Sequence, residues 1–440
     1  MSVRLRERAL IIWQAGVAAV LPERLLPIAV RDDALLSDAV RQAKRILVVG
    51  AGKAGAAMSV ALEIALAEYL LKVEGIVNVP TGTERPLERI RLHAARPAGS
   101  NHPTSAGVAG ANAMLDLLRN AGPDDVGLCL LSGGGSALLP APIATISLED
   151  KQAVTKLLHA SGATIHEMNA VRKHLSRIKG GRLAQAFTGR TLFSLIISDV
   201  VGDPLDVIAS GPTAADASTF AEAWAILERH RLLERVPASI ASTLRAGMTG
   251  GIPETLKSVP ANVHSRVLGN NRVALDAAFE QAKSLGYRVL DLGSFIEGET
   301  ASIAVAFAGI VRSIREDHIP FAPPVCLLSG GETTVSLGAS SGKGGRNQEF
   351  VLAMRAKLGD AGMKNLAILS GGTDGEDGPT DAAGGYLDEQ VKIDECELAT
   401  ALADHDAYPL LARCDGLLRT GLTQTNVMDV RVVLIDRRES

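Results

Sequence analysis

The chain has 440 residues, more than one hydrophobic core usually serves, so we expect two domains. Its 47% hydrophobic and 21% charged residues are typical of an ordinary globular protein. A formal net charge of -4 and the lack of a long basic run argue against a nucleic-acid-binding groove, whereas small anionic substrates stay open because a few local basic residues suffice to bind them.

The N-terminal segment combines Arg4, Arg6 and Arg8 with the apolar run ALIIWQAGVAAVL, as a signal peptide does. Glu7 lies among the arginines and Gln14 interrupts the run, so we expect a helix of the folded protein instead. No stretch of about 20 apolar residues follows, and we expect no membrane span. The 4 cysteines form no C-x-x-C pair, which indicates neither a zinc site nor a disulfide framework and predicts a cytoplasmic location.

Short apolar runs alternate with helical patterns along the rest of the chain. This alternation predicts an α/β fold with largely parallel sheets. Glycines and prolines break the pattern at 247–262, where we place the boundary between domains 1–250 and 251–440. An N-terminal helix that crosses back to the second domain stays open. The predicted strands are 45–50, 75–80, 126–134, 191–200, 324–331 and 365–372, and the clearest helices are 53–71 and 147–161.

A strand-then-glycine motif occurs as LLSGGGSALL at 130–139, LLSGGETTV at 327–335 and ILSGGTDGEDG at 368–378. In open α/β sheets ligands bind beyond the carboxyl ends of strands, where glycines let backbone N–H groups approach an anion. One copy is equally well explained as a tight strand-to-helix turn, but the repetition favours one anion site assembled from several strand ends. The candidate phosphate-binding loop comprises Ser132, Gly133, Gly134, Gly135 and Ser136.

The segment GAGKAG at 50–55 follows a predicted strand, opens a helix and matches G-x-G-x-x-G. A dinucleotide site would need an acidic residue at the end of the next strand, where this chain has Asn78 and Thr81. We therefore interpret Gly52 and Lys53 as part of a site for phosphate or carboxylate oxygens. A solvated lysine at a helix start is the competing interpretation.

The segment 165–184 is rich in basic residues and nearly free of acids. Asn169 and Arg172 fall on one face of its predicted helix, and Lys179 follows. A solvated basic helix would explain this pattern. The glycines at 180–181 favour instead a close approach of the backbone to a ligand, so these three residues are candidate anion-binding residues.

Asp199 lies at the end of the predicted strand 191–200, and Asp203 follows it. Carboxylates at this position suit Mg²⁺, which keeps several waters and bridges to substrate phosphates. Asp199 is equally suited to accept the proton of a substrate hydroxyl, and the two roles stay open.

Two glycine-rich loops of the C-terminal half add further candidates. The segment SSGKGGRNQEF at 340–350 places Arg346 and Asn347 directly before a helix, where a guanidinium can bind a phosphate or carboxylate bidentately. Asp374 lies in SGGTDGEDGPTD, whose spacing does not fit a calcium loop. Together these groups suit phosphoryl transfer, which needs positioned anions, cations that spread the developing charge, and an acid for the nucleophile or the metal.

These motifs resemble those of a known family. GAGKAGAAM, SNHPTS, LLSGGGSALL, NAVRKHLSRIKGGRLA, ISDVVGDPLDVIASGPT, LSGGETTV, GGRNQEF, SGGTDGEDGPTDAAGG and TQTNV occur in the order seen in class II glycerate 2-kinases, the DUF4147/MOFRL proteins, which are also often labelled hydroxypyruvate reductases. The similarity runs through nearly all of the chain. One departure is TQTNV, where related sequences commonly have a glycine in place of Gln424. This difference affects the expected contacts of this loop and leaves the expected reaction unchanged.

The resemblance implies a Rossmann-like domain over 1–250, a MOFRL-type α/β domain over 251–440 and an active site in the cleft between them. It implies ATP, Mg²⁺ or another divalent cation, and transfer of the γ-phosphoryl group to the C2 hydroxyl of D-glycerate. The family's catalytic lysine and arginine fall on Lys53 and Arg346. We expect D-glycerate and ATP as partners, with no nucleic acid and no membrane, and a homodimer is compatible with the sequence.

Two other functions compete with this one. A nicotinamide-dependent hydroxypyruvate reductase is supported by G-x-G-x-x-G but lacks the acidic residue that would bind the ribose. A non-catalytic sensor of a sugar phosphate or nucleotide would bind similar anions, yet it would not need acids gathered with Lys53 and Arg346.

Overall fold

The computed structural model describes residues 4–100, 102–338 and 342–437; Asn101 of SNHPTS and Ser340 and Ser341 of the glycine-rich loop lie outside this part. Its contacts divide the chain into two compact units. Pro22–Leu268 form the N-terminal unit, and Gly269–Ser440 together with Met1–Leu21 form the C-terminal unit. The division therefore falls at the end of strand β6 (Val263–Gly269), beyond the glycine- and proline-rich segment, and the first helix belongs with the C-terminal half.

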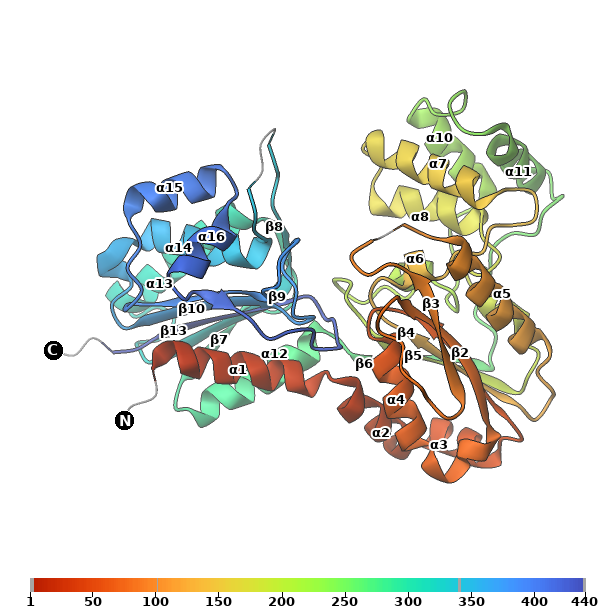
Figure 1. Ribbon diagram of the computed structural model, residues 1–440, viewed down its shortest axis with the longest axis horizontal. Helices are drawn as coiled ribbons and strands as arrows, with labels where there is room; N and C mark the ends of the chain where they lie inside the picture. Colours follow the sequence, from red (N-terminus) through yellow and green to blue (C-terminus); the bar gives the residue numbers. More distant parts are fainter. Residues whose placement is uncertain (1–3, 101, 339–341, 438–440) are drawn as a thin grey trace. The chain divides into compact units, whose positions relative to one another are not determined.

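The N-terminal unit contains a 6-stranded sheet with the order β3-β2-β1-β4-β5-β6 (Figure 1). The pairs from β3 to β5 are parallel, as predicted, and this order is the doubly wound arrangement of dinucleotide-binding folds. Its strand order reverses between β1 and β4, so the loops after these two strands meet at the place where such sheets bind ligands. The strands are β1 (Ile46–Ala51), β2 (Val73–Pro80), β3 (Ile90–Arg96), β4 (Val126–Leu131) and β5 (Thr191–Ile197).

Helices cover this sheet and form a separate cluster beside it. α4 contacts β2 and β4, while α5 contacts β1, β2 and β3. α7, α8, α10 and α11 pack on one another around their own hydrophobic core. Ser147 and Asp150 form the predicted capping box of α7. The bounds are α2 (Pro22–Asp32), α3 (Ala34–Gln42), α4 (Gly55–Ala65), α5 (Ser105–Arg119), α6 (Gly135–Leu138), α7 (Leu148–Ala160), α8 (Ile165–His174), α9 (Arg182–Ala186), α10 (Phe220–Arg229) and α11 (Ala238–Met248).

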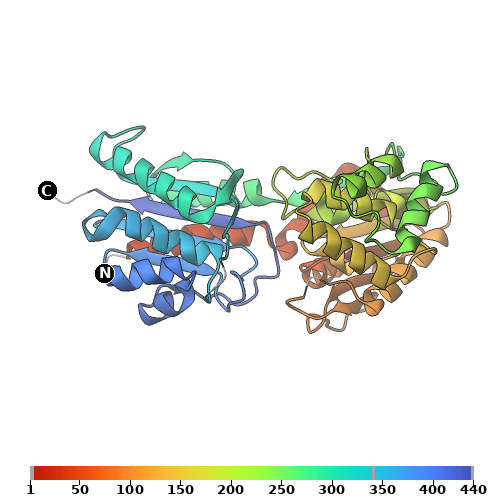
Figure 2. The same cartoon turned by 90° about the horizontal axis from the view of Figure 1, so that it is seen from above.

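The C-terminal unit has a 7-stranded sheet with the order β12-β11-β10-β13-β9-β7, and β8 also pairs with β9. The prediction of largely parallel strands is wrong for this sheet, because β13 pairs antiparallel with both of its neighbours, β9 and β10. Figure 2 shows β13 running through the middle of this unit. The strands are β7 (Arg288–Asp291), β8 (Ile296–Glu299), β9 (Val325–Thr334), β10 (Leu366–Gly372), β11 (Gly384–Asp388), β12 (Leu417–Leu418) and β13 (Asp429–Ile435).

The antiparallel insertion of β13 places the SGG segments of β9 and β10 on either side of it. β9 and β10 both continue through their SGG sequences, which are therefore parts of strands and not loops that follow strands. Asp429, the first residue of β13, pairs with Gly331 of β9 and with Gly372 of β10. The glycines of the two SGG sequences thus flank the backbone of Asp429.

Helices lie on both faces of the second sheet. α14 packs against α13, β10 and β11 on one face, and α1 packs with α12 against β10 and β13 on the other. Figure 1 shows α1 and α12 below this sheet. No single helix in the described ranges is long and apolar enough to cross a membrane, although α1 and α2 meet that test as a bent pair. The bounds are α1 (Leu5–Ala19), α12 (Asn271–Ser284), α13 (Thr300–Glu316), α14 (Arg346–Gly362), α15 (Glu395–Ala403) and α16 (Ala407–Arg413).

Trp13 of α1 tests whether the N-terminal helix is part of the C-terminal unit. Its side chain is buried, and its indole Nε1 donates a hydrogen bond to the Gly371 carbonyl at 3.2 Å. Trp13→Ala should lower the free energy of unfolding of this unit by about 3–5 kcal/mol, because it leaves a large cavity and an unpaired carbonyl. Urea denaturation monitored by circular dichroism measures the change. Ile11→Ala, on the exposed side of the same helix, is the control and should stay within about 0.5 kcal/mol of the wild type; equal midpoints for both variants would contradict the prediction.

Candidate functional site

The loops after β1 and β4 interlock at the switch point of the first sheet. The Lys53 amide donates a hydrogen bond to the Gly133 carbonyl at 2.8 Å, and the Ala54 amide donates one to Ser132 Oγ at 3.1 Å. A Cβ atom on Gly52 would lie 1.9 Å from Ser132 Oγ, so only glycine permits this approach. The structure thus brings together the predicted residues of these two loops, and it uses the hydroxyl of Ser132 to join them.

Gly134 turns the chain from β4 into α6. Its φ of 75° is left-handed, which glycine adopts without strain, and no side chain caps the helix that follows. The backbone of Gly133 accepts the Lys53 amide, while the Lys53 side chain is exposed. The loop therefore presents its small residues and a lysine at the carboxyl end of the sheet.

Ser136, in the first turn of α6, is the centre of a polar cluster. Lys179 Nζ donates to Ser136 Oγ and to the Ser136 carbonyl, both at 2.8 Å, and Arg172 Nη2 also donates to Ser136 Oγ. Ser136 Oγ lies 2.9 Å from Ser210 Oγ, and Ser210 Oγ donates to Asn169 Oδ1 at 3.1 Å. Four predicted anion-binding residues from two segments, the glycine loop and the basic segment 165–184, therefore meet in one place. We call Ser136, Asn169, Arg172, Lys179 and Ser210 the Ser136 cluster.

The positive charge of this cluster is not balanced by acids. Lys179 is 1% exposed and Arg172 is largely enclosed, yet neither forms an ion pair with a carboxylate in the described part of the chain. Burial lowers the pKa of Lys179 well below its usual range, and the neighbouring charges of Arg172, Lys151 and Lys173 lower it further. Lys173 differs, because its Nζ lies 3.1 Å from Asp206 and 3.3 Å from Asp216. An anionic ligand is the partner that Arg172 and Lys179 lack.

Ser210 is a member of the cluster that the sequence analysis did not single out. Ala209, Ser210 and Gly211 all adopt left-handed backbone conformations, with φ of 52°, 62° and 60°. The amides of Gly180 and Gly181 donate to the carbonyls of Ser210 and Gly211 at 3.1 and 2.7 Å, which holds this turn in place. Such strain persists only where surrounding contacts enforce it, and here it directs a hydroxyl at Ser136. In the sequence, the signal for this turn was ASGPT, which follows the acidic segment that contains Asp199 and Asp203.

Asp199 and Asp203 follow β5, as predicted, and both are half-buried. Asp203 has a left-handed φ of 54°, and its amide donates to the Val200 carbonyl at 3.1 Å. The described residues contain no group of three or more His, Cys, Asp or Glu side chains that could hold a metal ion. Mg²⁺ needs only one or two carboxylates when phosphate oxygens and waters complete its shell, so this acidic pair fits such an ion in chemistry.

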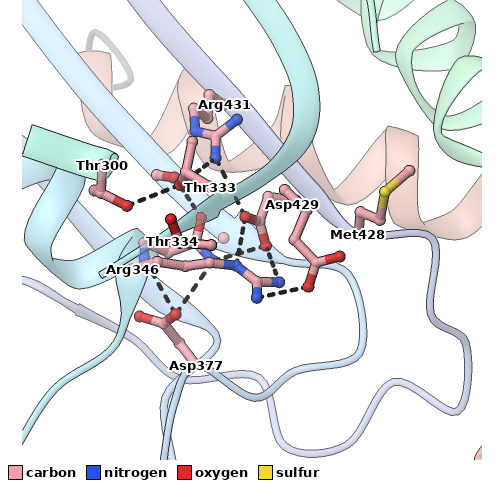
Figure 3. Close-up of polar contacts among 12 residues, drawn as sticks. Thr300, Thr333, Thr334, Arg346, Asp377, Met428, Asp429 and Arg431 are labelled. Atoms are coloured by element: carbon pink, nitrogen blue, oxygen red, sulfur yellow. Dashed lines mark hydrogen bonds and ion pairs between the residues drawn. The ribbon is translucent and has the colours of Figure 1, made fainter. Parts of the chain in front are cut away.

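Arg346 begins α14 in the C-terminal unit and binds the carboxylate of Asp429 (Figure 3). Its Nε lies 2.8 Å from Asp429 Oδ2 and its Nη2 lies 3.0 Å from Oδ1, while its Nη1 lies 2.7 Å from Glu332 Oε1. The sequence analysis expected the planar fork of Arg346 to bind a substrate anion. In this structure the fork binds Asp429 instead. Only Nη1 binds elsewhere, to the carboxylate of Glu332, which is more exposed than that of Asp429.

Asp377 holds the start of α14 next to Arg346. It accepts hydrogen bonds from the amides of Asn347 and Gln348 at 3.1 and 2.9 Å, a capping role that Gly345 cannot fill. Burial, together with the charge of Asp429, raises the pKa of Asp377 to about 7 against these hydrogen bonds. The raised pKa means that protonation of Asp377 favours the folded state. This stabilisation is therefore complete at acidic pH, below the usual pKa of an aspartate, and is lost as the pH rises through about 7.

Asn347 connects the two buried acids. Its Nδ2 donates to Asp429 Oδ1 at 2.9 Å and to Asp377 Oδ1 at 3.3 Å. The predicted residues Arg346 and Asn347 thus form one network with Asp429, whereas Asp374 stands at its edge and contributes a charge that helps to raise the pKa of Glu332. Burial is the main cause of that raised pKa. Asn347 is occupied in holding the network and is 1% exposed.

The sequence analysis did not assign Glu332, Asp429 or Arg431 to this network. Arg431 is fully buried; its Nη2 donates to Asp429 Oδ2 at 3.2 Å and to Thr333 Oγ1 at 3.0 Å (Figure 3). An acid and an arginine two residues apart at the start of an apolar strand were a visible signal, since neither belongs in a core without a partner. Gln424, in the motif that departs from the family pattern, has a left-handed φ of 67°, which glycine would adopt at lower cost.

Comparisons with known proteins agree with this architecture. Residues 8–245 match the model of DUF4147, described as a domain of unknown function, and residues 325–429 match the MOFRL family. The chain is 39% identical to a glycerate 2-kinase of Pyrococcus horikoshii over 89% of this chain and 87% of that one, and 37% identical to glycerate kinase of Homo sapiens over 99% and 94%. A protein of Agrobacterium vitis that is 42% identical, over 89% and 99%, is provisionally named a hydroxypyruvate reductase.

A solved structure gives the same result for the whole fold. The crystal structure of glycerate kinase from Thermotoga maritima superposes with a TM-score of 0.86 at 33% identity, covering 98% of this chain and 99% of the other. Both units and the order of the motifs are therefore shared with these proteins. The chain belongs to the DUF4147–MOFRL family, among whose members these named glycerate kinases are found.

Proposed function

We propose that this protein is a glycerate 2-kinase, which transfers the γ-phosphoryl group of ATP to the C2 oxygen of D-glycerate. The observation that carries the proposal is the Ser136 cluster, in which the half-buried Arg172 and the buried Lys179 have no carboxylate partner among the described residues. A site built this way is stabilised by a substrate that brings negative charge, as ATP and glycerate both do. The relatives named glycerate kinase support the choice of substrates.

The glycine loop and Lys53 are assigned to the transferring phosphoryl group. Lys53 follows Gly52 at the switch point, where its backbone amide is fixed on Gly133 and the residue is exposed. Phosphoryl transfer depends on positioning and on cations that neutralise charge on the equatorial oxygens. We assign Lys53 this electrostatic role in the transition state, with the Ser132–Ser136 loop and the Ser136 cluster binding phosphate or carboxylate oxygens.

Arg346 is assigned a second cationic role. Asp429 holds Nε and Nη2, so the orientation of the guanidinium is set before substrate arrives. Nη1 binds Glu332, whose side chain is 43% exposed and whose pKa is raised by burial. A substrate anion can replace this weakly held carboxylate on Nη1, whereas the buried Asp429 cannot be displaced.

The chemistry needs one proton acceptor and one metal ion. The C2 hydroxyl attacks the γ-phosphorus, the bond to the β–γ bridging oxygen breaks, ADP leaves, and the hydroxyl proton passes to a base. Asp199 is assigned as this base or as a ligand of Mg²⁺, with Asp203 as a further ligand. Bound Mg²⁺ would supply charge neutralisation on the phosphates of ATP.

A hydroxypyruvate reductase is the alternative that one group of relatives' names suggests. Its nicotinamide cofactor would need an acid at the end of β2, yet Asn78 occupies this place and donates both of its amide hydrogens, to the carbonyls of Gly107 at 3.1 Å and Leu138 at 2.7 Å. The amide therefore serves to join α5 and α6 to the sheet. A sample that oxidises NADH with hydroxypyruvate in the absence of ATP would revive this alternative.

The product of the reaction tests the proposed function directly. A coupled ADP-release assay with D-glycerate should show turnover, and phosphorus NMR of the product should show coupling to one proton, as in 2-phosphoglycerate. A clamp on the carboxylate also orders the adjacent C2 oxygen, whereas the C3 hydroxyl rotates about one more bond. Coupling to two protons would contradict the C2 assignment and leave a glycerate kinase. No ADP release would contradict the kinase itself.

Lys53→Ala tests the role of the lysine. It should lower kcat/KM by about 10²–10³, the scale of losing one electrostatic donor to a transition state. Steady-state kinetics measure the effect, and circular dichroism checks the fold. Lys44→Ala is the matched control, because Lys44 is exposed at the opposite end of β1 and should leave kcat/KM unchanged. A folded Lys53→Ala protein with wild-type kinetics would contradict the electrostatic role assigned to Lys53.

Arg346→Lys tests whether the geometry of the guanidinium matters beyond its charge. Lysine cannot reach both oxygens of Asp429 and also present a donor toward Glu332, so kcat/KM should fall by about 10–100-fold. Arg413→Lys, at an exposed arginine of the same unit, should have no effect. Full activity in Arg346→Lys would show that the arginine provides only a general positive field.

A further inference from the structure

Arg96 is the last residue of β3 and has no role in the site as described so far. The residue is 3% exposed, and its Nε has no hydrogen-bond partner. Its Nη1 reaches only the carbonyl of the next residue, Pro97, at 3.4 Å. Within the described ranges no carboxylate pairs with it, so this guanidinium is enclosed with most of its donors unused.

A buried arginine in this state is unusual, and a half-buried arginine beside the same sheet shows the ordinary pairing with a carboxylate. Arg45, directly before β1, binds the buried carboxylate of Asp125 through Nε at 3.0 Å and through Nη2 at 2.6 Å. Arg96 has no such partner, and burial alone lowers its pKa from the usual value. An enclosed guanidinium without a counter-charge is destabilising in the free protein unless a ligand completes it.

The guanidinium of Arg96 is directed at the candidate phosphate-binding loop. A Cβ atom placed on Gly134 would lie 3.1 Å from Arg96 Nη2 and 3.5 Å from Lys53 Cγ. Arg96 and Lys53 therefore approach the same glycine, two residues before Ser136 with its donors Arg172 and Lys179. The backbone of Arg96 is fixed, since the amide and Oγ1 of Thr81 donate to its carbonyl at 2.8 and 3.0 Å.

We propose that Arg96 is an anion-binding residue of this loop, whose guanidinium donates hydrogen bonds to phosphate or carboxylate oxygens of a substrate bound beside Gly134. The inference rests on the proposed function for the identity of the substrates, and it adds a residue that neither the motifs nor the relatives assign. The phosphates of ATP and the carboxylate of D-glycerate share the chemistry that a guanidinium recognises, so the test has one arm for each.

Replacing Arg96 should weaken ligand binding without lowering the melting temperature. An arginine that supports the fold would lower the melting temperature on removal, as expected for Arg45. Arg96→Gln removes an uncompensated charge, so the melting temperature of the ligand-free full-length protein should stay the same or rise. Ligand binding should weaken, because the oxygen that Arg96 meets loses a charged donor.

Isothermal titration calorimetry on the full-length protein measures binding separately for ATP with Mg²⁺, for D-glycerate and for inorganic pyrophosphate. Arg96→Gln should raise the Kd of at least one of these by about 10–100-fold, and Arg96→Lys should recover part of the loss. Arg91→Gln is the matched control, since Arg91 is exposed on the same strand and should change no Kd. A change confined to ATP and pyrophosphate identifies a phosphate as the ligand group, and a change confined to D-glycerate identifies the carboxylate.

Unchanged Kd values for all three ligands in a folded Arg96→Gln protein would overturn the inference. So would a change of equal size in Arg91→Gln, which would show a diffuse effect of charge. The pyrophosphate arm keeps this test separate from the proposed function: wild-type protein without ADP release contradicts the kinase, whereas loss of pyrophosphate binding in Arg96→Gln alone still supports an anion site at Gly134.

Discussion

The buried carboxylate of Asp429 is the constraint on which the C-terminal unit depends. It is fully buried and accepts hydrogen bonds from the side chains of Arg346, Asn347 and Arg431. Removing its charge would leave Arg346 with Glu332 alone and the fully buried Arg431 without a carboxylate. β13 places Asp429 between β9 and β10, and α14 brings Arg346 to it, so this interaction fixes the orientation of the arginine at the central strand of the sheet.

The network around Asp429 and the Ser136 cluster differ in how their buried charges are paired, and this contrast indicates where substrate charge is needed. Around Asp429 each enclosed cation has an acid, and the network is closed apart from Glu332 at its exposed edge. Around Ser136 and Gly134 the enclosed cations meet hydroxyls and carbonyls but no acids among the described residues. The first arrangement stabilises one orientation of Arg346. In the second arrangement, burying cations without acids costs free energy, and an anionic substrate offsets this cost.

Much of the fold and part of the site follow from the sequence. Alternating apolar runs predict the first sheet because a parallel strand buried on both faces leaves a continuous apolar segment, as in β1 and β4. The glycines of GAGKAG and SGGGS predict a close backbone approach at these two loops, and the structure shows it between Gly52 and Ser132, where no side chain fits. In the second sheet the same apolar runs could not reveal direction, because a strand buried on both faces has the same composition whether its neighbours are parallel or antiparallel.

The sequence by itself therefore determined the α/β class, the first sheet, the loops at its switch point and the basic segment that supplies Arg172 and Lys179. Only the tertiary structure decided which charges meet. Arg346 and Asp429 are 83 residues apart in the chain, and the partner of a charged residue depends on strand order that local patterns do not encode. The same holds for Ser210, whose left-handed turn is imposed by distant glycines, and for Arg96, whose lack of an acid is visible only once every neighbour is in place.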